Sequence, residues 1–452
     1  MKVIRLTYQG TEIEPSVYLL LFFRMAGIYV YERFWGTKNI QTEGLKAPDG
    51  EEIQRPPVFS AYDCELFILQ SESNLQEYGI LSGRQMERKV LLAKGEICPN
   101  AIDYTKFTQG KLLNAILNEL MLQQIITHSE KTELDDLAAI YDANHLTKLT
   151  LRAKYFFTAN EEQQLSDFQH AYDKIITDLT DCMWKSGCKW GDRKLFYTQY
   201  AAINMIYEVN CLCARYKRPQ LYNRDSLLEL CGALETGLDG LLGDSVKMLK
   251  GQIYDDLFFD PNSAYECYVN CCNYDKTYNS YVYYRKGSYW QEYKKDWKRA
   301  LKYYIQAVHF YPEYYRAWYK IGLCFIKLDR QKEAIMSYEN VRKCLSNRME
   351  GKCVRPMEIE HIFKAQIQIA SIWEEKGNLR NAVEALKWAE LIWNMIGQTS
   401  FFQLMCTSPK EQFFYRTKTI DNLNIHRVYE RLFVLYTMVG NREEALRYRG
   451  KL

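Results

Sequence analysis

The spacing of small and aromatic residues in the second half of the chain constrains the fold more than any other feature. Trp318, Gly322 and Phe325 recur at the intervals of one helix face, and after the turn-like letters LDRQKE the pattern continues in a shifted phase with Ala334 and Tyr338. A small residue where two helices cross lets their backbones approach, and a large side chain fills the space beside it. The pattern therefore predicts a helix, a short turn and a second, antiparallel helix, with Gly322 and Ala334 at the crossing.

The same pattern returns along the chain at a nearly constant interval. Ala264, Ala300 and Ala334 step by 300 − 264 = 36 and 334 − 300 = 34 residues. Two further copies contain Ala382 and Ala445, and their wider separation predicts longer helices or larger loops. A single helix pair cannot bury its apolar face, so consecutive pairs are expected to stack on one another.

These residues resemble the tetratricopeptide repeat (TPR), a helix–turn–helix unit of about 34 residues. The resemblance covers residues 245–452 and implies an all-α solenoid whose first helices line a groove for a peptide or protein partner. A solvated helix face without a partner is the alternative reading of the polar residues on these helices. The residues expected to line the groove are Tyr284, Arg285, Arg316, Tyr319, Lys320 and Lys327.

Composition indicates a folded chain of more than one domain and excludes one class of partner. A chain of 452 residues exceeds what one ordinary hydrophobic core holds. Hydrophobic residues make up 47% and charged residues 25%, which is typical of globular proteins. The formal net charge is only +3, so the basic surface of a nucleic-acid-binding protein is not expected. The 36 tyrosines suit packing surfaces between helices, with stacking on a ligand as the alternative.

Cysteine and histidine usage predicts a reducing compartment without a structural metal. The 14 cysteines are scattered, only six histidines are present, and no Cys and His stand at metal-finger spacing. His309, His361 and His426 lack partners in sequence and are expected to be surface or core residues. The most apolar run, residues 17–31, is too short to span a bilayer and contains Arg24. We therefore expect a soluble, cytoplasmic protein without a membrane segment.

The first part of the chain has the pattern of a parallel α/β sheet. Short β-rich runs alternate with helical or longer connections, and strands joined in this way form a parallel sheet covered on both faces. The expected strands are residues 2–8, 28–34, 64–71, 88–95 and 100–106, with helices over 16–27 and 109–126. This predicts a five-stranded, flavodoxin-like domain over residues 1–127.

The expected ligand crevice of this sheet lies at the carboxyl ends of its strands, near residues 7–10, 33–36 and 71–74. No GxGxxG, Walker A or GxSxG motif follows any of these strands, which argues against a standard dinucleotide fold, a P-loop enzyme or an α/β hydrolase. The runs IRLTYQG, AGIYVYERF and ELFILQSESN, in that order and with a long loop before the third, resemble the Toll/interleukin-1 receptor (TIR) domain family.

The resemblance implies two functions, self-association in signalling or cleavage of NAD. Catalytic TIR domains use a glutamate on the helix after the serine-ended strand, where a carboxylate stabilises the cationic sugar as nicotinamide leaves. Glu77 holds the most similar position, with Glu72 and Glu87 as further candidates. The Trp-Cys pair that usually precedes this glutamate is absent, so an ordinary solvated Glu77 remains the alternative.

NAD is accordingly a candidate substrate, and no cofactor is otherwise implied. The resemblance makes Tyr8, Trp35 and Ser71 the candidates for contacting the nucleotide. Packing in the domain core is the alternative role for Tyr8 and Trp35, since both rings are large and apolar.

Residues 128–240 show apolar spacing typical of helices but not the TPR pattern. They are expected to be either divergent helical repeats or an independent bundle, followed by the TPR-like repeats over 241–452. Two overall functions stay open: a signalling or defence-type protein whose solenoid binds a protein and whose TIR-like domain self-associates, or an NAD glycohydrolase regulated by the helical array. A receiver-like domain is disfavoured because the acidic residues it needs do not follow the first and third strands.

Overall fold

The fold is described from a computed structural model of the chain. Apart from some shorter stretches, the structure describes residues 2–9, 28–35, 62–69, 72–77, 88–106, 109–139, 224–235, 240–271, 276–350, 356–397 and 423–452. The chain divides into two compact units, each described by itself. The first holds residues 1–36 and 56–282, and the second holds residues 37–55 and 283–452.

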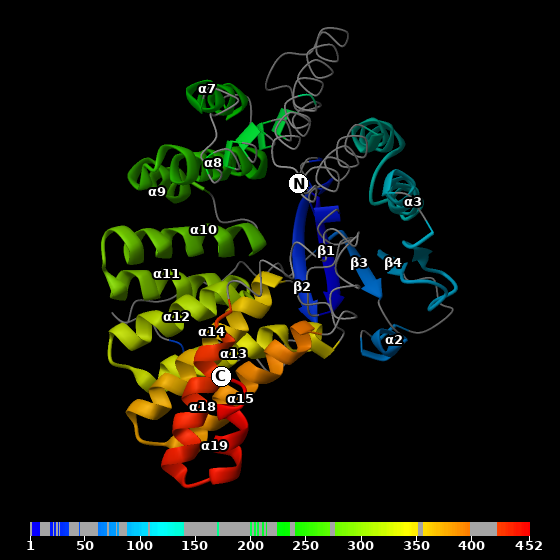
Figure 1. Cartoon of the computed structure of the whole chain (residues 1–452). Coiled ribbons are helices and arrows are strands. Elements are labelled where there is room, and N and C mark those ends of the chain that lie inside the picture. Colours follow the sequence, from blue (N-terminus) through cyan, green and yellow to red (C-terminus); the bar gives the residue numbers. More distant parts are fainter. Residues whose placement is uncertain are drawn as a thin grey trace. The chain divides into compact units, whose positions relative to one another are not determined.

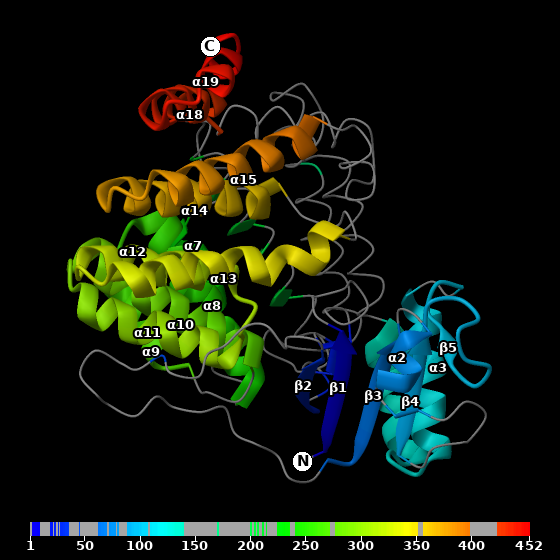
Figure 2. The same cartoon turned by 90° about the horizontal axis from the view of Figure 1, so that it is seen from below.

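The first unit contains the parallel sheet that the sequence predicts (Figure 2). Its strands are β1 (Val3–Gln9), β2 (Tyr29–Trp35), β3 (Cys64–Leu69), β4 (Lys89–Ala93) and β5 (Ile102–Asp103). All neighbouring strands are parallel, in the order β2-β1-β3-β4-β5, which is the order of flavodoxin-like sheets. The fifth strand is much shorter than expected, because only two of its residues pair with β4.

One face of this sheet forms the core of the first unit. Ile4, Leu6 and Tyr8 of β1 are buried on this face and alternate with Arg5 and Thr7, which lie on the other face, as the two-residue period of a strand requires. Leu113 and Leu117 of α3 (Gln109–Leu122) belong to the same hydrophobic cluster, and α3 lies beside β4 and β5 (Figure 2). A short helix, α2 (Ser73–Glu77), follows β3.

The described part of residues 128–240 is helical, as the sequence predicts. Residues 128–139 form a helix that begins with a capping box, in which Thr127 Oγ1 accepts from the Glu130 amide over 3.2 Å and Glu130 Oε2 accepts from the Thr127 amide over 2.7 Å. Further helices of this unit are α7 (Arg224–Glu235), α8 (Gly240–Ile253), the π-helical turn η2 (Tyr254–Phe258) and α9 (Pro261–Val269).

The division between the two units does not fall where the sequence places a domain boundary. Leu227 of α7 and Leu249 of α8 belong to the same hydrophobic cluster as the sheet, so α8 is part of the first unit. The predicted boundary lies at residue 240, whereas the units separate at Val282, inside α10 (Lys276–Ser288). The spacing of small and aromatic residues predicts the helical repeat, but it does not predict which hydrophobic core a given helix joins.

The second unit consists of the paired helices that the sequence predicts (Figure 1). After α10 come η3 (Tyr289–Tyr293), α11 (Trp297–Phe310), α12 (Tyr315–Lys327), α13 (Gln331–Glu350), α14 (Pro356–Glu375), α15 (Leu379–Gly397), α18 (Ile425–Val439) and α19 (Arg442–Arg449). From α11 onward, each helix packs against the next one described, so that α12 and α13, α14 and α15, and α18 and α19 form antiparallel pairs.

The repeated alanine holds the same place in every pair. It is the fourth residue of each second helix, from α9 to α19, and it is almost fully buried. Asp260, Asp296 and Asn441 begin three of these helices as N-caps, because their side-chain oxygens accept from amides in the first turn. The alanines concerned are Ala264, Ala300, Ala334, Ala382 and Ala445.

The repeated glycine is small for a reason that the sequence pattern only partly anticipates. A Cβ placed on Gly322 would lie 2.6 Å from Cε1 of Tyr338, so the tyrosine ring occupies the space that a side chain would need. The same contact joins Gly251 to Tyr268 and Gly287 to Tyr304, with the same 2.6 Å separation. Gly322 therefore accommodates an aromatic ring of the partner helix and does not simply let two backbones approach.

The spacing of these contacts explains the π-helical turns. From glycine to tyrosine the separation is 338 − 322 = 16 residues in the third pair, but 268 − 251 = 17 and 304 − 287 = 17 in the first two. Only those first two pairs contain a described π-helical turn, η2 and η3, at the end of the first helix. A π-turn takes up one extra residue in a helix, so the turns keep the glycine and tyrosine in contact despite the insertion.

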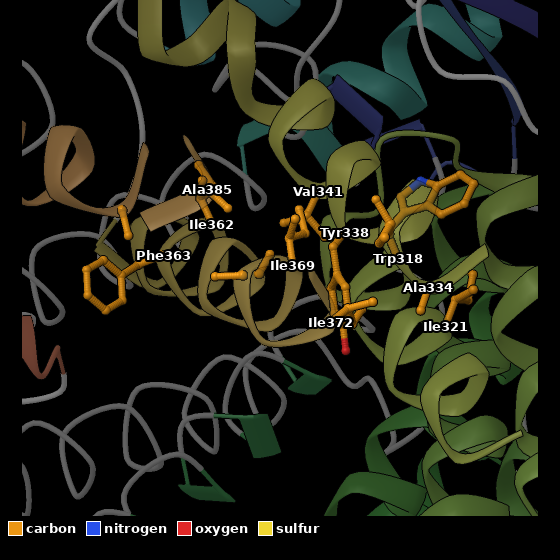
Figure 3. Close-up of a cluster of buried hydrophobic side chains, with 14 of the residues drawn as sticks. Trp318, Ile321, Ala334, Tyr338, Val341, Ile362, Phe363, Ile369, Ile372 and Ala385 are labelled. Carbon is orange, nitrogen blue, oxygen red and sulfur yellow. The ribbon is translucent and has the colours of Figure 1, made fainter. Parts of the chain in front are cut away.

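One hydrophobic cluster runs through the helix pairs of the second unit (Figure 3). Trp318 is fully buried there, and its indole Nε1–H donates to the Pro312 carbonyl over 2.7 Å. Tyr338 and Ile362 contribute to the same cluster from the following helices. Among the described helices, none combines the length and apolar character that crossing a bilayer requires.

Candidate functional site

Aromatic contacts join the first helix of one pair to the first helix of the next at two successive steps. Tyr284 of α10 lies 5.3 Å, between ring centroids, from Tyr314, which precedes α12. Tyr315 and Tyr319 of α12 meet His361 of α14 edge-on, at 5.1 and 5.5 Å. All five side chains are partly exposed. We call these five residues the aromatic face.

Cationic side chains accompany the aromatic face. Arg316 Nε donates to Tyr315 Oη over 3.1 Å, which holds the guanidinium beside the rings. Lys320 pairs with Glu292 over 2.8 Å, and both side chains are partly exposed, so this ion pair contributes little to stability. Half-exposed tyrosine and arginine are the residue types enriched at protein interfaces.

The predicted groove residues do not all join the aromatic face. Tyr284, Arg316 and Tyr319 are in it or in direct contact with it. Lys327 is exposed and lies 5.9 Å from the ring of Trp297 on α11, a second helix. Arg285 is half-buried on α10. The six residues thus occupy the first helices as predicted, but they form one continuous surface only in part.

The sequence pattern missed three members of the face. Tyr314 and Tyr315 stand at the start of α12, and His361 lies 46 residues after Tyr315. His361 has no partner nearby in the sequence and is expected to be a surface or core residue; in the structure its ring contacts two tyrosines of the preceding first helix. Its position on the first helix of the next pair is the only sequence signal for these contacts.

The residues proposed for nucleotide chemistry lie in or after the sheet. Glu77 is the last residue of α2, directly after β3, and Trp35 ends β2. Tyr8 of β1 is 0% exposed and belongs to the sheet core, so in this structure its ring does not face an open site. Ser71 lies outside the described residues, as do the side chains of Glu77 and Trp35.

The described polar network of the sheet lies on its other face. Glu65 of β3 is 1% exposed and accepts from Arg5 Nε over 2.8 Å and from Thr7 Oγ1 over 2.7 Å. The Arg5 guanidinium also lies 3.8 Å from the centroid of the Tyr62 ring. A buried carboxylate that accepts this many hydrogen bonds is a stabilising element between strands, because its charge is already compensated.

Neither metal chemistry nor reactive thiols are indicated in the part of the chain that the structure describes. There, no group of three or more His, Cys, Asp or Glu side chains is placed to hold a metal ion. The described cysteines are free thiols, and most are buried. The buried ones act as small apolar residues of the cores.

Comparison with known proteins gives structural likenesses only. No protein-family model and no curated protein matches this chain. One crystal structure of MamA shares 22% sequence identity with this chain, covers 38% of it and 89% of its own chain, and has a TM-score of 0.31. A second crystal structure of MamA shares 21% identity, covers 43% of this chain and 94% of its own, and has the same TM-score. A structure titled as the human IFIT1 dimer with PPP-AAAA shares 14% identity, covers 75% of this chain and 86% of its own, and also has a TM-score of 0.31.

These solved structures are TPR-type helical-repeat proteins. Because a TM-score of 0.31 is a weak likeness, the assignment of helical repeats to the second unit rests on its own helix pairs and Gly–Tyr contacts.

Proposed function

We propose that this protein is a helical-repeat scaffold that binds a segment of another protein through the aromatic face of α10, α12 and α14. The observation that carries the proposal is that partly exposed rings meet at both steps between the three first helices, at 5.3 Å between Tyr284 and Tyr314 and at 5.1 and 5.5 Å between the α12 tyrosines and His361. Rigid aromatic side chains offer a large contact area at low entropic cost.

The polar groups on this face suit a peptide. The Lys320 ammonium is partly exposed and carries three donors, one of which meets Glu292. These donors match main-chain carbonyls and acidic side chains of a partner segment. The near-neutral overall charge gives no comparable support for nucleic acid as the partner.

The test is site-specific photo-crosslinking of the full chain in its own cells. A photo-reactive phenylalanine analogue in place of Tyr319 should crosslink to one defined protein, and the same group in place of the exposed Lys332 on α13 should not. Arg316→Ala should then weaken binding of the recovered partner about ten-fold or more. Equal crosslinking from both positions, or none from Tyr319, would count against the aromatic face.

For the first unit we propose a TIR-like role, either self-association in a signalling or defence context or cleavage of NAD. The strand order supports this class, because in flavodoxin-like sheets ligands bind where β1 and β3 end, and α2 with Glu77 begins at the end of β3. The combination of such a unit with helical repeats favours a cytoplasmic signalling protein.

Incubation of the purified protein with NAD separates the two roles. The enzymatic role predicts release of nicotinamide that Glu77→Gln abolishes and that Glu133→Gln, at an exposed position of the helix over residues 128–139, leaves intact. If the protein releases none even at high concentration, the enzymatic role fails and self-association, measured by analytical ultracentrifugation, is what remains to be tested.

A further inference from the structure

Three helix pairs share one contact, in which the ring of a tyrosine on the second helix lies over a glycine on the first. The tyrosines Tyr268, Tyr304 and Tyr338 are each at most 1% exposed, so each hydroxyl needs a partner inside the protein. Because these hydroxyls extend beyond the glycine, what lies just after the glycine on the first helix decides whether they find one.

In the first two pairs the π-helical turn contains a side chain that accepts a hydrogen bond from the tyrosine hydroxyl. Tyr268 Oη donates to Asp255 Oδ2 over 3.1 Å, and Tyr304 Oη donates to Gln291 Oε1 over 2.6 Å. Both acceptors stand four residues after the glycine, at 255 − 251 and 291 − 287, and both belong to a π-turn. In the second pair Ser288 Oγ also lies 3.3 Å from the same tyrosine hydroxyl.

The third pair lacks this acceptor. The residue four after Gly322 is Ile326, and the one directly after it is Leu323, neither of which has a side-chain acceptor. Within the described residues, Tyr338 Oη has no hydrogen-bond partner. Burying a hydroxyl without a partner disfavours the closed arrangement relative to one in which the hydroxyl meets water.

We propose that the α12–α13 pair is the deformable joint of the second unit. Opening this pair lets Tyr338 gain a hydrogen bond to water, whereas opening the α10–α11 pair breaks the bond between Tyr304 and Gln291. The third pair therefore opens at a lower free-energy cost than the second. Regions of low opening free energy are the ones that rearrange most readily.

The joint is in contact with the aromatic face. The ring of Tyr319 lies 5.6 Å from the ring of Tyr338 and 5.5 Å from that of His361. Movement of Tyr338 out of the space over Gly322 therefore alters the support of Tyr319. If the face binds a partner as proposed above, this joint is where the helix array adjusts to it, but the joint itself does not depend on that function.

Native-state hydrogen exchange of the full chain, without any partner, tests the joint. Amides of α12 should exchange about ten-fold faster than those of the regular helical part of α10, the factor that corresponds to about one hydrogen bond. Tyr304→Phe should speed exchange in α10 and α11 by a similar factor. Tyr338→Phe should leave exchange in α12 and α13 unchanged or slower, because it removes only an unpaired hydroxyl.

A variant that adds a hydrogen-bond acceptor for Tyr338 is expected to slow exchange, a result that misfolding cannot produce. Ile326→Gln places an amide oxygen four residues after Gly322, as Gln291 stands after Gly287, and should slow exchange in α12 and α13. The matched variant Ile326→Leu should not. The proposal is overturned if Tyr338→Phe speeds exchange as much as Tyr304→Phe does, or if α10 and α12 exchange equally in the wild-type chain.

Discussion

Tyr448 donates its hydroxyl hydrogen to Glu390 Oε2 over 2.6 Å, which ties α19 to α15 across 58 residues of chain. Lys451 Nζ forms an ion pair with the other carboxylate oxygen, Oε1, and Glu390 is only 7% exposed. A second tie joins the same helix pairs, since Arg431 of α18 donates to Glu374 of α14 over 2.9 Å. The last helix pair is thus held in place by charged contacts as well as by its apolar face.

The tie at Glu390 predicts acid sensitivity of the last helix pair. Burial alone would raise the pKa of Glu390, but the hydrogen bonds from Lys451 and Tyr448 outweigh it and hold the pKa below its ordinary value. A carboxylate whose pKa is lowered by folding stabilises the protein above its unfolded pKa of about 4.3, and the contribution is lost as the pH falls through the lower folded value. The protection factors of amides in α18 and α19, which correct the measured rates for the pH dependence of intrinsic exchange, should therefore fall in this range.

Glu390→Gln should remove that dependence. The variant loses a hydrogen bond to a charged group, which contributes about 1.5–3 kcal/mol, so α18 and α19 should already exchange faster at neutral pH and respond less to acid. Glu384→Gln, at an exposed position of the same helix, is the matched control and should behave as the wild type. An unchanged acid response in Glu390→Gln would show that other carboxylates govern it.

The Gly–Tyr contact predicts opposite effects of the same substitution at two helical glycines. Gly322→Ala should destabilise the protein by about 1–3 kcal/mol because the new Cβ would meet the Tyr338 ring at 2.6 Å. Gly232→Ala in α7 should be neutral or stabilising by up to about 1 kcal/mol, since a Cβ added there would meet no atom within 4 Å. Chemical denaturation of both variants checks the sign.

Combination with Tyr338→Leu should rescue Gly322→Ala. The following helix pair already carries Ala370 and Leu386 at the same separation of 386 − 370 = 16 residues, and both are buried. A double variant no more stable than Gly322→Ala alone would contradict the assignment of the ring as the obstacle.

Trp318 anchors the cluster of the second unit and should be its most sensitive position. Trp318→Ala should cost about 3–5 kcal/mol, because it removes a fully buried ring. Trp318→Phe should cost less, although it leaves the Pro312 carbonyl without its indole donor. The denaturation midpoint of Trp318→Phe should therefore lie below that of the wild type, and the midpoint of Trp318→Ala should lie lower still. Equal midpoints for the two variants would argue against burial of the ring as the main contribution of Trp318 to stability.

The buried cysteines should resist thiol reagents in the native protein. Burial raises the pKa of Cys64, and likewise the pKa of Cys231 and Cys324, to about 12. Since the thiolate is the reactive form, these three should remain unlabelled by iodoacetamide at pH 8 and react only after denaturation. Mass spectrometry of the labelled peptides shows which cysteines react in the native protein and which react only after denaturation. Rapid labelling of Cys324 in the native protein would contradict the prediction and would mean that α12 opens far more often than the burial of Cys324 implies.

Much of the fold follows from sequence patterns that act over short distances. The strands around Leu6, Leu66 and Leu92 could be predicted because a strand alternates or buries its side chains within a few residues. The α12–α13 pair could be predicted because Gly322 and Tyr338 meet across a single turn. Of the candidate site, the pattern predicted Tyr284 and Tyr319 but missed Tyr314, Tyr315 and His361.

The sequence by itself determined that the second half folds as helix pairs, because contacts within a pair join residues about 16 apart and leave a regular mark on the spacing. Only the tertiary structure decided the order β2-β1-β3-β4-β5, the pairing of Arg5 with Glu65, and the ties from Arg431 and Tyr448. These partners lie 57 to 60 residues apart, and nothing in their spacing records the contact. Which distant side chains meet is settled by how whole elements pack, and that depends on every residue at the interface at once.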